Sequence, residues 1–500
     1  MSLDRASATP LHMQIYAQLR DAILSRRLPQ GERLPATRTL AEELGCSRST
    51  VTGAFDQLMA EGYIDGKVGS GTFVSAGIAE ELLGLKQRGP PGSTIGRPAL
   101  QPSRRGAMLA GLRSLRRLPT VPFVPGMPDT GSFPFKTWSA ILKRVWRAPD
   151  ASLLEHADPR GHDGLRQEIA KHLTSVRALR CSADQIVITA GAQQAYNIAA
   201  RVLLDPGDQV WLEDPGYPGL RAAFIGAGAR PIDVPIDEDG LDVERGRRLA
   251  PKARLAAVAP SHQYPLGVTM GLERRLELIR WASDAQAWIV EDDYDSEFRY
   301  RANPLAALQG LDEDGRVIYV GTFSKVLFPS LRLGYLVVSE ALVELFAKAR
   351  LALGAYPSMQ AQPVLAEFMA EGHFAAHLRR MRNLYQQRQE ALMRQLDAAL
   401  SHAVSVAPKE CGMHLVARLA PPFTAPGLDA EIAARAAEHG IVVPSLSEYG
   451  AGAPPYQGLV LGYAAFDEPT LARGVAILAE AFERATQARG RKAASSRRRP

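Results

Sequence analysis

The 500-residue chain is poor in cysteine and contains no long apolar run. Its three cysteines lie far apart, so the sequence predicts neither a disulfide framework nor a paired metal-ligand spacing. No apolar stretch reaches the roughly 18 residues that a transmembrane helix needs. The N-terminal residues Met1 to Asp4 lack the basic and apolar regions of a secretory signal. We therefore expect a cytoplasmic protein with reduced thiols and no membrane partner.

Charge is distributed unevenly along the chain. Residues 1–75 carry eight basic and eight acidic residues, whereas residues 76–120 carry eight basic and only two acidic ones. The last segment, 489–500, has six basic residues and no acid, which leaves 121–488 with a net charge of −6. Basic, flexible segments favour a polyanionic partner such as DNA, although a solvated linker and a solubilising tail would have the same composition.

The first 75 residues have the pattern of three short helices followed by a hairpin. Ile15, Leu19 and Ile23 recur at helical spacing after Pro10, and Gly45 separates a second helix from a third that begins near Ser47. The third helix is expected to bury four apolar residues, which are Val51, Phe55, Leu58 and Met59. Two short strands around the glycine-rich turn of residues 66–71 complete the segment.

Two helices joined by a tight turn predict a helix-turn-helix, whose second helix presents its first side chains to the major groove. Here that helix begins Ser47-Arg48-Ser49-Thr50, so Arg48, Ser49 and Thr50 are candidate DNA contacts. Arg38 on the preceding helix is placed to touch the backbone. The hairpin turn adds Lys67, Gly69 and Gly71. A small helical domain with an exposed arginine is the alternative that geometry alone leaves open.

Residues 76–120 are rich in Pro, Gly, Ser and Arg and predict a flexible basic linker. After Val121, short apolar runs alternate with helical patterns, which predicts a mostly parallel sheet covered on both faces. The runs are 186–188, 210–212, 255–258, 288–290, 317–320 and 335–338. The segment 489–500 is expected to be a disordered basic tail.

Four polar motifs follow these apolar runs. Lys325 stands after one run, beside the hydroxyls of Thr322 and Ser324 and seven residues before Arg332, as in a Schiff-base lysine next to an anion site. Asp292 follows another run and is suited to hold a pyridine nitrogen protonated, with the phenol of Tyr294 nearby. Each motif alone is also explained by an ordinary loop.

The other two motifs are turns after strands. Ala192 and Gln193 open a helix after Gly191, and free N–H groups there form an anion site. Tyr217, in Asp214-Pro215-Gly216-Tyr217, is placed to stack on a flat ring. Two histidines, His373 and His377, have helical spacing but no intervening glutamate, so we predict no metal site.

Several motifs in residues 10–75 together resemble the GntR-type winged helix. They are Leu34-Pro35-Ala36-Thr37-Arg38, Ser47-Arg48-Ser49-Thr50-Val51, Glu61-Gly62-Tyr63 and Gly69-Ser70-Gly71-Thr72-Phe73-Val74. The resemblance implies that Arg38, Arg48, Ser49, Thr50 and the wing touch an operator in double-stranded DNA.

Residues 120–485 resemble fold-type-I pyridoxal-phosphate enzymes of the aspartate and kynurenine/α-aminoadipate aminotransferase group. The resemblance implies that Lys325 forms the aldimine with pyridoxal 5'-phosphate, that Asp292 partners the pyridinium and that Tyr294 partners the phenolate. It makes Tyr217 the stacking ring. It also implies a phosphate cup made by Ala192, Gln193, Thr322, Ser324 and Arg332.

Both motif sets on one chain are similar to the MocR/GabR subfamily of GntR regulators, of which Pro260-Ser261-His262-Gln263-Tyr264-Pro265 is typical. We therefore predict a multi-domain α/β protein. It has a winged helix-turn-helix over 1–75, a linker over 76–120, and an aminotransferase-like domain over 121–488. That domain has a mostly parallel sheet and a smaller C-terminal α+β part. The resemblance also implies a head-to-tail homodimer that senses a small amine or amino-acid-like effector.

Besides Ala192, which lacks the hydroxyl often found in the phosphate cup, the chain departs from the aminotransferase pattern at two positions. Tyr264 stands where an asparagine precedes the proline, and Val460 where an arginine grips the substrate carboxylate. Arg221 is a substitute candidate for an acid group. These departures favour a sensor over the alternative of a working aminotransferase with an added DNA-binding domain. A cofactor-free DNA-binding scaffold is a third possibility, against which the intact Asp292, Tyr294, Lys325 and Arg332 argue.

Overall fold

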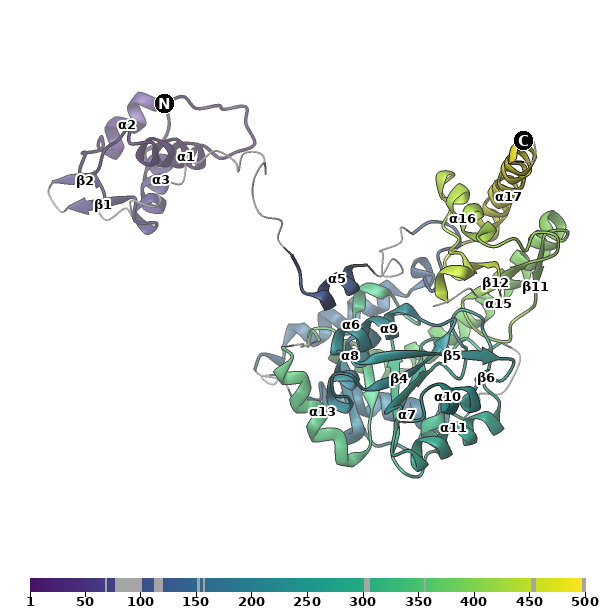
Figure 1. Cartoon of the computed structure of the whole chain (residues 1–500). Coiled ribbons are helices and arrows are strands. Elements are labelled where there is room, and N and C mark those ends of the chain that lie inside the picture. The colour runs from purple at the N-terminus through teal and green to yellow at the C-terminus, as the bar shows by residue number, and fades with distance from the viewer. Residues whose placement is uncertain are drawn as a thin grey trace. The chain divides into compact units, whose positions relative to one another are not determined.

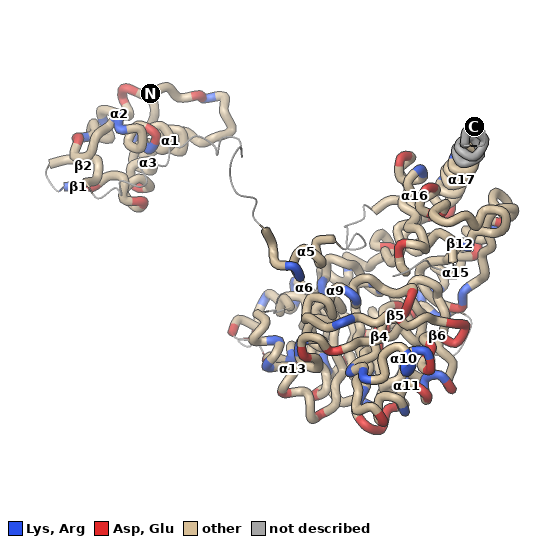
Figure 2. The backbone as a smooth tube through the Cα atoms, viewed as in Figure 1, with Lys and Arg blue, Asp and Glu red and all other residues tan. Residues whose placement is uncertain are grey.

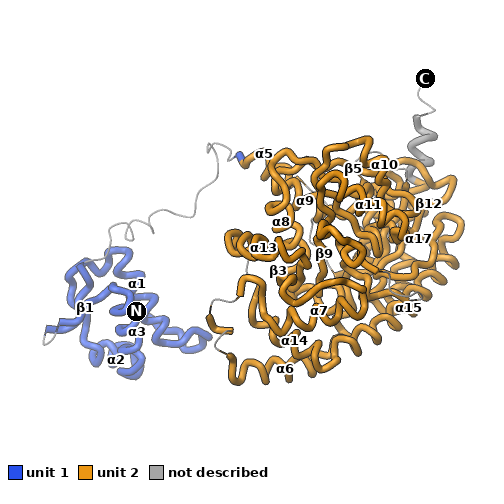
Figure 3. The backbone as a smooth tube through the Cα atoms, turned by 90° about the horizontal axis from the view of Figure 1, so that it is seen from below, with its two compact units in different colours: residues 1–101 blue, residues 102–500 orange. Residues whose placement is uncertain are grey.

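The computed structural model describes residues 1–67, 70–76, 101–111, 120–150, 153–155, 158–300, 306–354, 357–450 and 456–496, with side chains up to residue 487. The chain divides into two compact units, residues 1–101 and 102–500 (Figure 3). None of the helices in these ranges combines the length and apolar character needed to cross a lipid bilayer.

The described residues of the first unit form three helices and a two-stranded sheet (Figure 1). They are α1 (Leu11–Leu24), α2 (Thr37–Leu44), α3 (Arg48–Ala60), β1 (Ile64–Lys67) and β2 (Gly71–Val74). The strands form the predicted antiparallel hairpin, in which Lys67 faces Gly71. The predicted apolar faces of α1 and α3 form its core, except that Met59 is 43% exposed. Met59 follows Leu58, and successive side chains on a helix point about 100° apart, so Met59 lies at the edge of the face that Leu58 buries.

The second unit is built on an eight-stranded sheet in the order β3-β10-β9-β8-β7-β4-β5-β6. The bounds are β3 (Ile186–Thr189), β10 (Gly334–Val337), β9 (Val317–Thr322), β8 (Trp288–Asp293), β7 (Leu255–Val258), β4 (Gln209–Asp214), β5 (Arg230–Asp237) and β6 (Gly240–Leu241). Pairing is parallel from β9 to β5 and antiparallel where β10 meets β9 and β3 and where β6 meets β5. All six predicted strands belong to this sheet, which confirms the mostly parallel architecture.

Helices cover both faces of this sheet. One face packs against α8 (Ala192–Leu203), α9 (Pro218–Ala227) and α13 (Glu340–Ala352). The other packs against α7 (Asp163–Arg177), α10 (Val243–Leu249), α11 (Leu272–Asp284) and α14 (Gln362–Ala370). Successive residues of one strand alternate between these layers, as Val210 and Trp211 do. Because both faces are buried, these strands appear in the sequence as unbroken apolar runs.

A smaller antiparallel sheet and its helices form the C-terminal part. The sheet contains β11 (Val404–Val406), β12 (His414–Leu419) and β13 (Gly458–Gly462). The helices are α15 (His373–Leu400), α16 (Leu428–Glu438) and α17 (Glu468–Ser496). Helix α17 continues into the segment for which the sequence predicted a disordered tail. Further helices in the described residues include α5 (Arg104–Ala110), α6 (Phe135–Arg147), α12 (Leu308–Leu311) and the 3-10 helix η6 (Leu446–Tyr449).

The segment predicted as a linker contains α5, which lies against α9 of the second unit. Arg105 Nη1 donates to the Gly226 carbonyl at 3.5 Å, and Ser103 caps the helix by accepting from the Gly106 amide. Part of the predicted linker is therefore helical. The rest, 77–100 and 112–119, lies outside the described residues.

Candidate functional site

The carboxyl ends of neighbouring parallel strands bring the predicted cofactor residues to one edge of the large sheet. Asp292 is the penultimate residue of β8, and Lys325 follows the end of β9 by three residues. Since β8 and β9 are paired in parallel, both ends lie side by side. Ligands bind at such edges of open α/β sheets because the loops that follow the strands diverge there.

A cavity of about 360 Å³ opens at this edge. All nine residues that the sequence predicted for the cofactor line it. They are Ala192, Gln193, Tyr217, Asp292, Tyr294, Thr322, Ser324, Lys325 and Arg332. The structure thus brings together, in one cavity, motifs that lie up to 140 residues apart in the sequence.

Lys325 points its amine at the backbone of a distant segment. Its Nζ donates to the Gly126 carbonyl at 2.8 Å. Burial lowers the pKa of this amine, while the carboxylates of Asp295 and Asp292 oppose the shift. Gly126 has a φ of +71°, and a Cβ there would lie 2.7 Å from Nζ, so a larger residue would strain the backbone and displace the amine.

Asp292 is a buried carboxyl with one oxygen unsatisfied. It is 4% exposed, and its Oδ1 has no hydrogen-bond partner in the described structure. Burial raises its pKa to about 7, although a hydrogen bond with Tyr196 and the charge of Lys325 favour the ionised form. An unpaired buried acceptor costs free energy. A ligand donor that reaches Oδ1 would remove that cost.

A separate group of donors suits an anion. The amides of Ala192 and Gln193 precede the first hydrogen bonds within α8, and the Gly191 cap adopts a φ of +91°. Thr322 and Ser324 lie across the cavity, joined by a bond from the Ser324 amide to Thr322 Oγ1 at 3.2 Å. Arg332 is exposed and adopts the left-handed conformation just before β10.

Tyr294 is engaged by a buried histidine. Its hydroxyl lies 3.0 Å from His262 Nδ1, which also lies 3.0 Å from an oxygen of Asp295. His414 completes a cluster in which the candidate metal-ligand atoms of His262, Asp295 and His414 lie within 4.8 Å of one another. Hydrogen bonds already engage these residues, since His262 pairs with Asp295 and His414 Nε2 lies 2.9 Å from the Pro265 carbonyl.

The two departures from the aminotransferase pattern are visible in the structure. Val460 is fully buried in β13 opposite Val416, so no guanidinium extends from that position. The hydroxyl of Tyr264 lies 2.9 Å from that of Tyr449, and both rings line the cavity.

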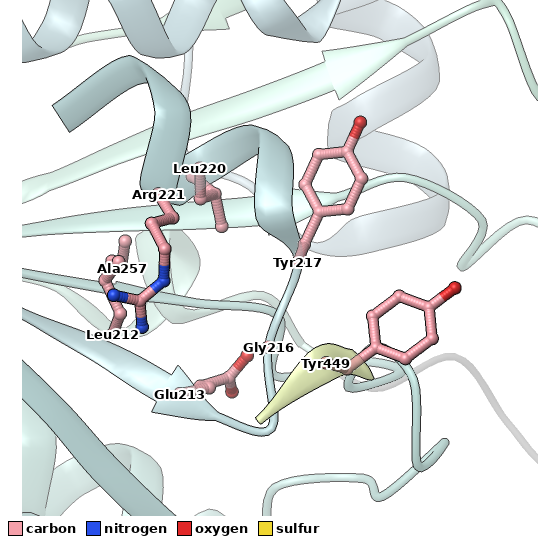
Figure 4. Close-up of a pocket in the computed structure, with 8 residues that line it drawn as sticks. All are labelled: Leu212, Glu213, Gly216, Tyr217, Leu220, Arg221, Ala257 and Tyr449. Carbon is pink, nitrogen blue, oxygen red and sulfur yellow. The ribbon is translucent and has the colours of Figure 1, made fainter. Parts of the chain in front are cut away.

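Arg221 does not line the main cavity. It lies in a smaller neighbouring one of about 20 Å³ with Glu213, and it forms an ion pair with Asp233. Figure 4 shows that the rings of Tyr217 and Tyr449 extend away from Arg221 and Glu213, toward the main cavity that both rings also line.

Glu213 makes the stability of the second unit sensitive to pH. Burial raises its pKa from 4.5 to about 8, and its Oε1 has no partner in the described structure. Between these values the unfolded chain releases a proton that the folded chain retains, so stability falls as pH rises, by up to about 1.4 kcal/mol per pH unit. Glu213→Gln is expected to remove this contribution. Urea midpoints from pH 5 to 8 should then decline less for the variant than for the wild type.

The matched control is the exposed Glu238→Gln, which should follow the wild-type pH dependence. A constant difference between Glu213→Gln and the wild type at every pH would show that Glu213 does not titrate in this range.

The predicted DNA contacts lie on the first unit. Ser47 caps α3, and its hydroxyl lies within 2.8 Å of those of Ser49 and Thr50. Arg48 Nε donates to Thr37 Oγ1 at 3.4 Å, and Arg38 forms an exposed ion pair with Glu42. In the hairpin, Lys67 lies over the Phe73 ring and Gly71 has a φ of +108°. Gly69 lies outside the described residues.

Basic and acidic residues are mixed over the first unit (Figure 2). This agrees with the net charge of zero over residues 1–75.

Several cavity residues were not predicted. Gly126, Tyr196, Met413, His414 and Tyr449 come from loops, a helix and the C-terminal part, with no motif around them. Only the helical spacing of Tyr196 after Ala192 could have indicated it, since positions four apart share a helix face.

Comparison with known families gives two matches. Residues 11–74 match the family described as bacterial regulatory proteins, gntR family, and residues 129–478 match aminotransferase class I and II. The chain is 42% identical to the probable rhizopine catabolism regulatory protein MocR of Rhizobium meliloti, over 96% of this chain and 95% of that protein. It is 32% identical to the pyridoxine biosynthesis transcriptional regulator PdxR of Corynebacterium glutamicum, over 94% and 96%.

Solved structures of aminotransferases resemble the second unit. The α-aminoadipate aminotransferase LysN of Thermus thermophilus, complexed with N-(5'-phosphopyridoxyl)-L-leucine, superposes with a TM-score of 0.66 at 27% identity. That match covers 73% of this chain and 92% of LysN. Kynurenine aminotransferase of Pyrococcus horikoshii, in complex with PMP, gives a TM-score of 0.66 at 27% identity over 77% and 95%.

Proposed function

Because this chain belongs to the MocR/GabR subfamily of GntR regulators, which joins a winged helix to a class I and II aminotransferase domain, we propose that it senses a small amine through pyridoxal 5'-phosphate held on Lys325. It is a DNA-binding transcription regulator with a fold-type-I aminotransferase-like domain. The proposed properties are that the effector is an amine, that the cofactor is linked to Lys325, and that effector binding is coupled to DNA binding.

The observation that carries the proposal is that the unpaired Oδ1 of Asp292 and the amine of Lys325 belong to one cavity. The protonated ring nitrogen of the cofactor would supply the donor that Oδ1 lacks. A positive charge there would also lower the pKa of Asp292 and keep the carboxylate ionised.

The other residues predicted for the cofactor suit its phosphate and its ring. A phosphate would be held by the amides of Ala192 and Gln193, where the dipole of α8 adds a favourable potential. The hydroxyls of Thr322 and Ser324 and the guanidinium of Arg332 would complete the cup. Tyr217 would cover one face of the ring, and Tyr294 would reach its oxygen.

When bound, the cofactor supplies an aldehyde carbon that primary amines attack, so an effector amine competes there with the amine of Lys325. The lowered pKa of Lys325 favours its uncharged, nucleophilic form. The Gly126 carbonyl orients this amine through the 2.8 Å hydrogen bond.

We further propose that the effector changes operator affinity by binding one domain arrangement better than another. A ligand shifts such an equilibrium only through this differential affinity. The operator contacts would come from Arg38, Arg48, Ser49, Thr50, Lys67, Gly69 and Gly71. A head-to-tail homodimer would place two winged helices on two half-sites.

Arg48→Ala is expected to weaken operator binding. One good arginine contact to a base is worth about 1–3 kcal/mol, so the Kd should rise by roughly 5- to 150-fold. Electrophoretic mobility-shift assays at a fixed salt concentration, with DNA from upstream of the regulated gene, measure this Kd. Arg473→Ala, which removes the same charge from the second unit, should leave the Kd within about twofold.

Borohydride reduction followed by peptide mapping tests the cofactor site. Incubation with pyridoxal 5'-phosphate should give a visible absorbance band, and reduction should fix the cofactor to the peptide that contains Lys325. A protein that takes up no cofactor, or fixes it on another lysine, would contradict the proposed site.

A further inference from the structure

Apart from the nine residues predicted for the cofactor, and from Gly191 and Tyr196 that adjoin them, nine further residues line the main cavity. They are Pro125, Gly126, Pro218, Tyr264, Asp295, Pro329, Met413, His414 and Tyr449. This set, which we call the effector wall, contains aromatic rings and one acid but no lysine or arginine. Among the described residues that line the cavity, the only cations are Lys325 and Arg332, and both belong to the proposed cofactor site.

A carboxylate would find no counter-charge at the effector wall. It would lie in a cavity that already holds the carboxyl of Asp295, which is 1% exposed. His414 adds no positive charge, because burial lowers its pKa to about 3. Val460 occupies the position of the expected carboxylate fork, and Arg221 is paired with Asp233 outside the cavity. A buried anion without a partner is strongly disfavoured.

The effector wall offers hydrogen-bond partners to the hydroxyl groups of a ligand. The hydroxyls of Tyr264 and Tyr449, 2.9 Å apart, share one hydrogen bond, which leaves one O–H donor and several lone pairs for a ligand. The Tyr264 ring meets those of Tyr449 and His414 edge to face, with centroids 5.3 and 5.2 Å apart. Such a box offers apolar ring faces to C–H groups and polar atoms to hydroxyls.

Resting on the proposed function, we infer that the effector is a primary amine that carries no carboxylate and whose carbon skeleton bears hydroxyl groups. The amine competes at the cofactor with Lys325, and the hydroxyls bind Tyr264 and Tyr449. α-Amino acids are poor ligands because their carboxylate has no partner on the effector wall.

A matched pair of ligands tests this inference. Serinol and serine share an amine-bearing carbon and a hydroxymethyl group, and serinol has a second hydroxymethyl group in place of the carboxylate. Titration of the cofactor-loaded full-length chain, followed by calorimetry and by the visible absorbance band, should give a Kd at least about tenfold lower for serinol. Serine that binds as tightly as serinol would overturn the inference.

Tyr449→Phe tests the hydroxyl contact. Loss of one neutral hydrogen bond should raise the Kd for serinol by roughly three- to tenfold. The Kd for isopropylamine, which has no hydroxyl, should not change. The matched control is Tyr456→Phe, because Tyr456 lies under Arg418 outside the cavity. Equal losses for both amines would contradict the hydroxyl contact.

Different experimental results would exclude the proposed function and the proposed class of effector. Absence of the absorbance band, or of cofactor fixed on Lys325, removes the proposed function. A normal band with a preference for serine removes only the assignment of the effector class.

Discussion

Lys325→Ala is expected to abolish covalent retention of the cofactor. The amine of Lys325 is the only lysine amine that lines the described cavity, and no neighbouring side chain there can replace it. The variant should show no visible band at a cofactor concentration that saturates the wild type, and borohydride should fix no cofactor in the peptide that contains position 325. Dialysis should remove bound cofactor from the variant and not from the reduced wild type.

The same variant separates cofactor binding from folding. The alanine removes the Gly126 hydrogen bond and a buried amine, so thermal unfolding must be recorded beside the absorbance. Lys348→Ala is the matched control, because Lys348 is an exposed lysine paired with Glu344. A variant that folds and still shows the visible band would show that another amine holds the cofactor.

Asp292→Asn is expected to be the second most damaging change at the site. The substitution keeps the size of the side chain but removes the charge that would face the ring nitrogen. A hydrogen bond to a charged group contributes about 1.5–3 kcal/mol, so cofactor affinity should fall by roughly 10- to 150-fold. Equilibrium dialysis of unreduced protein against pyridoxal 5'-phosphate measures this loss.

The pH dependence of cofactor affinity tests the role of the Asp292 carboxylate independently. In the cofactor-free chain its pKa is raised to about 7 by burial. Since the ionised carboxylate is the better partner for a protonated ring nitrogen, cofactor affinity of the wild type should weaken as pH falls below 7. An asparagine side chain cannot ionise, so the Asp292→Asn variant should lack that dependence. Asp233→Asn, outside the main cavity, should retain the wild-type affinity and its pH dependence.

The sequence predicted six of the eight strands of the central sheet because these strands are buried on both faces. Each of the six apolar runs from 186–188 to 335–338 became a strand of the sheet. Strand β5 was missed because Pro231 and Pro235 interrupt it. It tolerates them near the edge of the sheet, where only the two-residue β6 lies outside it.

The nine residues predicted from the motifs after these strands line one cavity for a related reason. Parallel strands end at one edge, so residues that follow them lie near one another whatever their separation in sequence. The effector wall could not be found in this way. Met413 and His414 come from the C-terminal part and Gly126 from the segment after the linker, and only tertiary packing brings them together.

Within the second unit, hydrogen bonds hold the segment that follows residue 120 at two points. Phe123 pairs with Gly462 beside β13, with the Gly462 amide donating to the Phe123 carbonyl at 2.8 Å. Three residues later, Gly126 accepts from Lys325. The position of Gly126 therefore depends on the pairing of Phe123 with Gly462 of β13. A shift of β13 would accordingly displace the carbonyl that accepts from the Lys325 amine, three residues further along the chain.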